Sequence, residues 1–326
     1  MREALLLKGA SMNSRNSLLY MLENHVIEIP KTLVCHEDQD NLKRFLLRFP
    51  HDFTSCLLLE RTLACHKPGV DLTMHVPAGS SGRKMLAGTN DGLPLTWFDE
   101  PAWCHARNLA KNSGEWILLE IDAEQFPRVC PVPHLFLSPS RSGLEAAMAC
   151  LTALQGDPPP LEIFTCVFNC LRAIPASHGL CLMGRMLGRG HNDVRVLIPF
   201  KKLATLKDYL EAVNWPGDPY TQSGFHLIPD DADCYLLNLE VGSSVRRRIG
   251  IEPYFWNLNR DDTNPRWRLY IDGLLEAGLC TPEEAEALRC FPGQRSNEFC
   301  ASVSTKLLID KDLQVKAYLS IDRSVH

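Results

Sequence analysis

Apolar and polar residues alternate in short paired runs along most of the chain. Each pair consists of two apolar-rich stretches joined by turn residues, a pattern that predicts a β-hairpin. The five predicted hairpins are 55–64 with 70–76, 116–122 with 134–138, 180–187 with 194–200, 234–241 with 249–255, and 303–309 with 313–321. They recur at intervals of about 54 to 69 residues, which indicates an internal structural repeat.

Between the hairpins, apolar residues recur three and four positions apart, which predicts α-helices. The predicted helices are 16–26, 36–49, 101–112, 143–154, 161–174, 203–213, 266–279 and 282–291. The Gly/Ser-rich segment 77–94 is predicted to be a loop.

Hairpins joined by helices predict an antiparallel sheet in an α+β protein. Ten strands in an open sheet would leave two unpaired edges and one uncovered face. We therefore expect a closed antiparallel ten-stranded β-barrel surrounded by helices, an αββα barrel. Residues 1–50 are expected to form an N-terminal helical lead-in, and residues 51–326 a single barrel domain of five hairpin/helix repeats.

The last hairpin contains the stretch KLLIDKDLQVKAY. If residues 310–312 form a three-residue loop, Ile309 pairs with Leu313 and Lys306 lies directly opposite Lys316. Like charges that face each other destabilise a sheet. Two explanations are open: this polar face meets water, or it lines a cavity that receives an anion.

If the helices cover the more apolar face of every strand, the other face lines the barrel interior. The alternation then directs these charged and aromatic side chains inward: Arg61, Trp116, Glu120, Arg185, Arg195, Glu252, Tyr254, Lys306, Lys316 and Tyr318. Such a set is too charged for a dry core. Converging cations need carboxylates or a bound anion, and a diphosphate would satisfy several of them together. Aromatic rings nearby would shelter a carbocation.

Composition narrows the possible partners. The formal charge of -5, with Arg246–Arg248 as the only tight basic run, argues against nucleic-acid and membrane-surface binding. No apolar stretch approaches the roughly 20 residues of a membrane span, and the first residues do not have the pattern of a secretory signal, so a cytoplasmic location is expected. The 13 cysteines form no CxxC pair, which favours free thiols over a disulfide framework or a zinc site.

Five hairpins alternating with helices, with the K-x-Y pattern of Lys316 and Tyr318 on a strand, resemble the aromatic prenyltransferases of the αββα-barrel type. The resemblance covers most of the chain after about residue 50. It implies an isoprenyl diphosphate donor held by lysines and arginines, tyrosines that shield the allyl cation, and an aromatic acceptor, with no cofactor or metal required. It also implies that Glu120, on an early strand, orients the acceptor and accepts its proton.

The sequence leaves two classes of function open. The first is a transferase that binds an isoprenyl diphosphate or another anionic small molecule and modifies an aromatic or peptide acceptor. The second is an accessory protein that binds a peptide or ligand without chemistry, and a different enzyme on the same barrel is a further alternative. The individual residues also have plainer explanations. In these explanations, the lysines and arginines would lie on a solvated face or pair with surface carboxylates. Glu120 and Glu252 would be exposed or pair with an arginine. Trp116 and Tyr254 would be aromatic residues of the core or the barrel rim.

Overall fold

The structure, a computed structural model, describes the greater part of the chain. The described residues are 29–50, 52–65, 69–89, 93–112, 116–139, 143–155, 160–189, 192–255, 264–291 and 299–323. The helix expected at 16–26 therefore lies outside the described residues.

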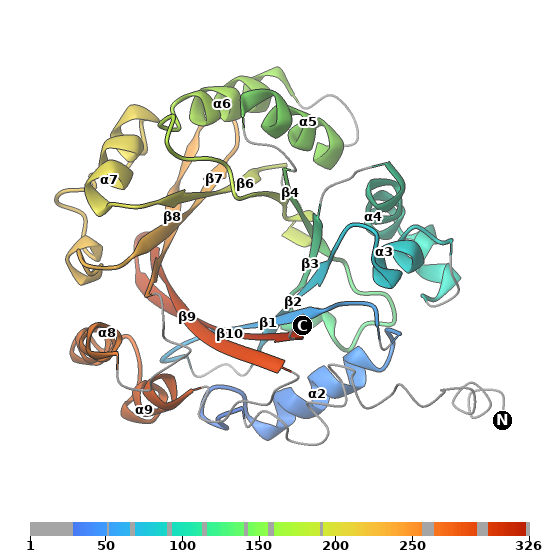
Figure 1. Cartoon of the computed structure of the whole chain (residues 1–326), viewed down its shortest axis with the longest axis horizontal. Helices are drawn as coiled ribbons and strands as arrows, with labels where there is room; N and C mark the ends of the chain where they lie inside the picture. The colour runs from blue at the N-terminus through green and yellow to red at the C-terminus, as the bar shows by residue number, and fades with distance from the viewer. Residues whose placement is uncertain are drawn as a thin grey trace.

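All five predicted hairpins form, and together they close into one barrel (Figure 1). The strands are β1 (Cys56–Thr62), β2 (Asp71–Val76), β3 (Trp116–Ile121), β4 (His134–Ser138), β5 (Leu182–Arg185), β6 (Val194–Phe200), β7 (Cys234–Val241), β8 (Val245–Tyr254), β9 (Phe299–Ile309) and β10 (Leu313–Arg323). Each strand is antiparallel to the strand before it, and β10 pairs with β1 to complete the circle. The prediction of a closed antiparallel ten-stranded barrel is confirmed.

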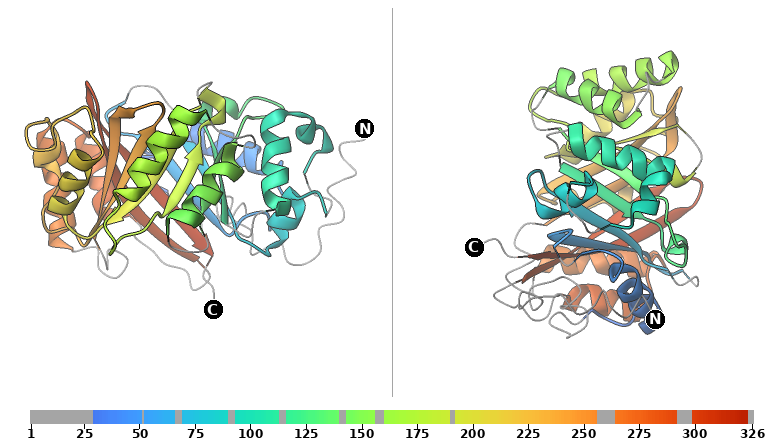
Figure 2. Two further views of the ribbon diagram at one scale, coloured as in Figure 1. Left: turned by 90° about the horizontal axis from the view of Figure 1, so that it is seen from above. Right: turned by 90° about the vertical axis from the view of Figure 1, so that its right-hand side faces the viewer.

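Helices pack around the outside of the barrel and leave its axis free (Figures 1 and 2). The α-helices are α2 (His36–Leu46), α3 (Ser81–Leu86), α4 (Pro101–Asn112), α5 (Leu144–Gln155), α6 (Leu161–Arg172), α7 (Leu203–Ala212), α8 (Pro265–Glu276) and α9 (Pro282–Cys290). Short 3-10 helices are η3 (Leu95–Asp99), η4 (Ala123–Gln125), η5 (Leu187–Arg189) and η6 (Phe225–Leu227). The expectation that 77–94 is a loop is wrong in part. Ser80 caps the first turn of α3 by accepting a hydrogen bond from the Arg83 N–H.

The main hydrophobic core lies between the barrel wall and the helices. Outward-facing strand residues such as Leu59, Leu119 and Leu307 are almost fully buried there against residues of the helices. A second, smaller apolar cluster lies inside the barrel; it contains Leu118, Phe136, Met186 and Leu197. The outer core stabilises the fold, because burial of each large apolar side chain contributes about 1.5–3 kcal/mol.

The register of the last hairpin is the predicted one. Ile309 pairs with Leu313, and Lys306 lies directly opposite Lys316. A shift by one residue would place Lys306 in the apolar layer under the helices, so the hydrophobic pattern fixes this register.

The cysteines that the structure describes are free thiols, as the spacing predicted. Within the described ranges, no helix combines the length and the apolar character that a membrane crossing requires.

Candidate functional site

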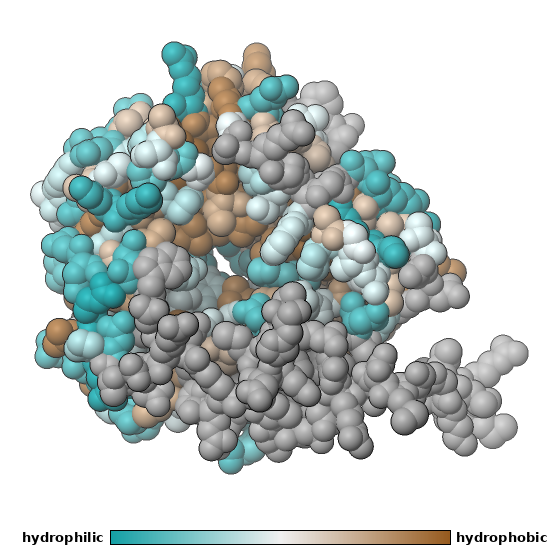
Figure 3. Space-filling model, in the orientation of Figure 1, coloured by the Kyte–Doolittle hydropathy of each residue, from teal (hydrophilic) through white to brown (hydrophobic). Residues whose placement is uncertain are grey.

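The barrel encloses a cavity of about 470 Å³ to which all ten strands contribute. We call this cavity the chamber. Its uncharged walls consist mainly of Cys56, Leu58, Thr73, Leu118, Phe136, Cys181, Leu182, Leu197, Leu236, Pro253, Tyr254, Phe255 and Tyr318. Figure 3 shows that the molecule is hollowed at the centre, along the barrel axis. The chamber falls within the range of small-molecule pockets, roughly 300–1,000 Å³.

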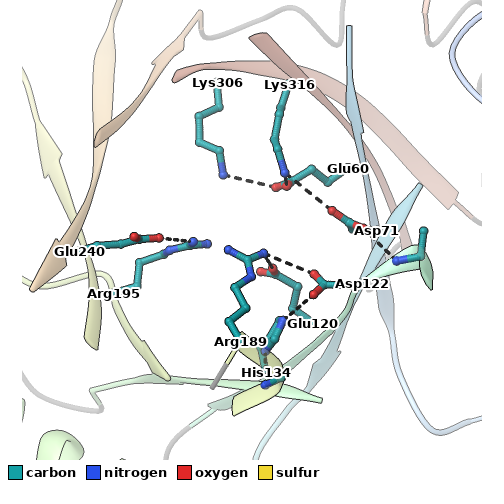
Figure 4. A network of polar contacts seen from close by, with 12 residues as sticks. Glu60, Asp71, Glu120, Asp122, His134, Arg189, Arg195, Glu240, Lys306 and Lys316 are labelled. Carbon is teal, nitrogen blue, oxygen red and sulfur yellow. Dashed lines mark hydrogen bonds and ion pairs between the residues drawn. The ribbon is translucent and has the colours of Figure 1, made fainter. Parts of the chain in front are cut away.

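A layer of charged residues crosses one end of the barrel, near the ends of several odd-numbered strands and the starts of even-numbered strands (Figure 4). We call it the ion-pair layer. It consists of Glu60, Asp71, Glu120, Asp122, His134, Arg189, Arg195, Glu240, Lys306 and Lys316. Its members come from most of the strands, so the barrel itself holds them in place.

Glu60 lies between the two facing lysines. Lys306 Nζ donates to Glu60 Oε2 at 3.3 Å, and Lys316 Nζ donates to Glu60 Oε1. Burial raises the pKa of Glu60, but attraction by Lys306 and Lys316 outweighs it and holds the pKa well below its usual range. The Lys306 ammonium also lies 4.7 Å from the centre of the Tyr318 ring. The Glu60 carboxylate therefore relieves the repulsion between the two lysines. The sequence pattern had suggested a bound anion for this role.

Gly250 of β8 leaves room for Lys306. A Cβ atom at this glycine would lie 2.7 Å from Lys306 Cδ, closer than van der Waals contact allows. The aliphatic part of Lys306 therefore passes over bare backbone on its way to Glu60.

Arg195 pairs with Glu240 across β6 and β7. The two residues are cross-strand partners, and Arg195 Nη2 lies 2.6 Å from Glu240 Oε1. Burial raises the pKa of Glu240, but attraction by Arg195 outweighs it and the pKa lies below its ordinary value.

Arg189, from η5 between β5 and β6, reaches two carboxylates at the end of β3. Its Nη2 lies 3.3 Å from Asp122 Oδ1 and 3.8 Å from Glu120 Oε1. His134 Nε2 lies 2.9 Å from Asp122 Oδ2. Burial raises the pKa of Asp122, but the hydrogen bond from His134 and the charge of Arg189 outweigh it and bring the pKa to about 2.

Glu120, Asp122 and His134 also resemble a metal site, since their ligand-type atoms lie within 4.8 Å of one another. The hydrogen bonds of the imidazole do not fit that role. The Gly188 N–H donates to His134 Nδ1 at 3.2 Å, so Nδ1 is unprotonated and Nε2 carries the proton that it donates to Asp122. A metal ion would need the lone pair of Nε2, and Arg189 already supplies positive charge at this place.

Glu252 of β8 is a further carboxylate of the chamber wall, only 6% exposed. Asn238 Nδ2 donates to its Oε1 at 2.8 Å, and the Tyr254 hydroxyl donates to its Oε2 at 3.0 Å. Burial raises the pKa of Glu252 above the ordinary value, and attraction by Lys306 offsets this only in part.

A small hollow of about 20 Å³ lies within the charged end of the barrel. Of the described residues that line it, five are cations and two are carboxylates. They are Arg189, Arg195, Arg248, Lys306 and Lys316, with Glu60 and Glu240. The hollow has room for about one water molecule. The residues that line it therefore carry an excess of positive charge.

No protein-family model and no curated protein matches this chain in sequence. Its structure, in contrast, is similar to solved structures of aromatic prenyltransferases. The 6-dimethylallyltryptophan synthase from Micromonospora olivasterospora, in complex with DMASPP and Trp, has a TM-score of 0.56 at 12% identity, over 92% of this chain and 97% of that one. A second 6-dimethylallyl tryptophan synthase structure has a TM-score of 0.56 at 13% identity, over 95% and 96%. The prenyltransferase PriB, in its apo form, has a TM-score of 0.57 at 12% identity, over 93% and 96%.

The chain has the prenyltransferase barrel fold. The expected resemblance is thereby confirmed at the level of architecture. At identities of 12–13%, the comparison supports the fold only. The roles of the site residues follow from the structure of this chain alone.

Within this prenyltransferase barrel, most of the side chains expected inside do lie inside. Glu120, Arg195, Glu252, Tyr254, Lys306 and Tyr318 line the chamber, and Lys316 lines the small hollow. Trp116 shares its face with Leu118 and Glu120, but it is 53% exposed at the start of β3 and does not line the chamber. Trp116 is thus a rim residue.

Two residues expected inside the barrel lie outside it. Arg61 faces α2, with Nη1 3.7 Å from Asp38 Oδ2. Residues 56–59 are all apolar, so this strand has no alternation that could identify its inner face. The structure turns Leu57 and Leu59 outward and Glu60 inward, which moves Arg61 to the outer side.

Arg185 also lies on the outer side. Its guanidinium donates to the Gln155 carbonyl of α5 at 3.2 Å and to Asn192 Oδ1 at 2.8 Å. The inner position of this strand belongs to Gly184, where a Cβ would lie 2.1 Å from the Phe136 ring. The packing of Phe136 over Gly184 therefore sets the faces of β5 opposite to those predicted.

Several residues of the ion-pair layer were not predicted from the sequence. Glu60 was hidden by the ambiguous face of β1, and Asp71 and His134 stand at the first positions of their strands. Asp122 directly follows β3, and Arg189 lies in a hairpin connection without a periodic signal. The pairing of Glu240 with Arg195 depends on the register between two repeats, which the sequence pattern does not supply.

Asp71 gives the ion-pair layer a measurable pH dependence. Burial and repulsion by Glu60 raise its pKa to about 6, although Lys316 and the Ala123 N–H oppose the shift. Because this pKa lies above the ordinary value of about 3.9, the folded state binds more protons than the unfolded state between about pH 4 and pH 6. This group therefore lowers the free energy of unfolding as pH rises through that window.

We expect Asp71→Asn to raise the free energy of unfolding at pH 7 by about 1 kcal/mol, and the gain to disappear near about pH 4. Urea unfolding of both proteins across this range measures the difference. Asp99→Asn, at an exposed position, is the control and should show no such trend. A difference that stays constant with pH would contradict the raised pKa of Asp71.

Proposed function

We propose that this protein is a transferase that binds an isoprenyl diphosphate and transfers the prenyl group to an aromatic or peptide acceptor. One observation carries the proposal: inside the same barrel, the small hollow, lined by five cations and two carboxylates, adjoins a chamber with largely apolar and aromatic walls. An isoprenyl diphosphate has the same division, an anionic head and an apolar tail. The prenyltransferase barrel fold supports the assignment.

In this proposal the diphosphate binds among Arg195, Lys306 and Lys316, and the prenyl tail extends into the chamber. The positive charges would stabilise the negative charge that develops on the departing diphosphate. The faces of Tyr318 and Tyr254 would stabilise the allyl cation. Glu120, on the chamber wall, would then accept the proton that the acceptor loses after attack.

The diphosphate has to displace a carboxylate. Glu60 occupies the position between the two lysines, and the hollow there is too small for two phosphate groups. Donor binding is therefore expected to move the Glu60 side chain away from at least one lysine. Hydrogen bonds from the lysines to phosphate oxygens replace those lost to Glu60.

The second candidate is a binding protein without chemistry, and the ion pairs favour it. Lys306 and Lys316 are paired with Glu60, Arg195 with Glu240, and Arg189 with Asp122. A lumen that is already neutralised in this way would hold an uncharged or cationic ligand without any change of partners.

One experiment distinguishes the two functions. The protein is incubated with dimethylallyl and geranyl diphosphates and a set of indole, phenol and tyrosine-peptide acceptors, while thermal stability and diphosphate release are followed. Release that requires both donor and acceptor supports the transferase. Stabilisation by the donor without release supports the binding protein, and the absence of any thermal shift excludes diphosphate from the site.

The double variant Glu60→Gln/Lys306→Met tests where the diphosphate binds. It leaves the net charge of the protein unchanged, because it removes one carboxylate and one cation together. Under the transferase proposal it keeps its fold and loses most of the donor-dependent release. Unchanged release would place the diphosphate elsewhere.

A further inference from the structure

The charges that line the chamber are mostly negative. The described residues on its wall include four carboxylates and two cations. They are Glu60, Glu120, Glu252 and Asp322, with Arg195 and Lys306. Both cations already have carboxylate partners, Glu240 and Glu60. The chamber thus presents an unbalanced negative charge to whatever occupies it.

Glu252 is the most deeply buried of these four carboxylates. Among the described residues, no lysine, arginine or histidine nitrogen lies within 4.0 Å of its carboxylate oxygens. Lys306, the cation that attracts it, directs its ammonium to Glu60 at 3.3 Å instead. A buried carboxylate without a counter-ion is costly, and a ligand cation would remove that cost.

The geometry of Glu252 leaves room for a ligand. A carboxylate has about four lone-pair positions, and Asn238 and Tyr254 occupy one on each oxygen. These two neutral donors fix the orientation of the carboxylate on the chamber wall. The aromatic residues Tyr254, Phe255 and Tyr318 line the same cavity and would also attract a cation.

We propose that Glu252 is the binding site for a positively charged nitrogen, an ammonium or guanidinium group, carried by an otherwise apolar or aromatic acceptor. This inference rests on the proposed function, because it takes the ligand of the chamber to be the acceptor. The acceptor's cation would bind on the chamber wall, and the donor's diphosphate at the ion-pair layer. The two sites are neighbours, because Asn238, which donates to Glu252, also lines the small hollow.

The test uses three probes of nearly equal shape: phenylpropylamine, phenylpropanol and phenylpropanoate, which are cationic, neutral and anionic at neutral pH. Dissociation constants are measured by calorimetry in the absence of any diphosphate, so a failure to observe prenyl transfer does not affect the result. We expect the amine to bind about tenfold tighter than the alcohol, and the carboxylate to bind most weakly.

The decisive variant is Glu252→Gln, which keeps the shape of the side chain and removes its charge. We expect it to bind amine and alcohol equally, with the affinity for the alcohol unchanged, which also shows that the chamber is intact. Glu276→Gln, at an exposed position at the end of α8, is the matched control for the loss of one negative charge and should keep the preference.

Two results would overturn the assignment. Either the alcohol binds wild-type protein as tightly as the amine does, or the preference for the amine survives in Glu252→Gln. In the second case, loss of the preference in Asp322→Asn would assign the cation to Asp322.

Discussion

Replacing Glu60 by glutamine is expected to destabilise the protein by about 3 kcal/mol and, at the same time, to increase its stabilisation by inorganic diphosphate. The substitution leaves the buried Lys306 and the partly buried Lys316 facing each other without the carboxylate that now contacts both. A bound anion would restore the lost charge balance. The free energy of unfolding, measured by urea denaturation with and without diphosphate, reports both effects.

Glu276→Gln, at an exposed position at the end of α8, is the control for the loss of one negative charge. It should change neither the stability nor the response to diphosphate. If Glu60→Gln loses stability while its response to diphosphate stays at the wild-type level, the lysines do not share an anion site.

Glu60→Gln should also lose less stability on acidification than the wild-type protein does. The reason is that the wild-type contribution of Glu60 disappears as pH falls through its depressed pKa.

The second large effect is expected at the pair of Arg195 and Glu240. The Arg195→Met substitution leaves the partly buried Glu240 without its 2.6 Å partner, and removal of one member of a fully buried pair costs about 3–5 kcal/mol. We expect a loss near the lower limit, about 3 kcal/mol, since Arg248 and Arg189 also attract Glu240.

The double variant Arg195→Met/Glu240→Leu should recover most of that loss, because apolar side chains of similar volume replace buried ion pairs at little cost. A double-mutant cycle by denaturant unfolding measures the coupling. The comparison pair is Arg246 with Asp193, where the arginine side chain is 44% exposed, and Arg246→Met should cost less than about 1 kcal/mol. Equal costs at the two sites would mean that water screens the ion-pair layer as it does the surface.

The barrel was predictable because its determinants are local. Hairpin turns and the alternation of residues such as Leu313, Val315 and Ala317 lie within a few positions of each other, and the register of β9 with β10 followed from them. The closure of ten strands then followed from the need to avoid open edges. The same local alternation correctly placed Lys306, Lys316, Glu252 and Tyr254 inside.

The ion pairs were not predictable because their partners are distant in sequence. Glu60 and Lys316 are 256 positions apart, and only the pairing of β1 with β10 brings them together. Where the local pattern was ambiguous, packing decided the faces: Gly184 lies under Phe136, so Arg185 is outside. The sequence therefore indicated a cationic lumen, and the structure shows one in which carboxylates balance those cations.

The pairing of β1 with β10 has a consequence for biosynthesis. Ribosomes add roughly 5–20 residues per second, so Glu60 is synthesised well before the lysines that neutralise it, 246 and 256 positions later. Until the last hairpin has left the ribosome, β1 and β8 are free edges and Glu60 has no counter-ion from β9 or β10. Premature termination just before that hairpin would thus release a chain that exposes strand edges to aggregation.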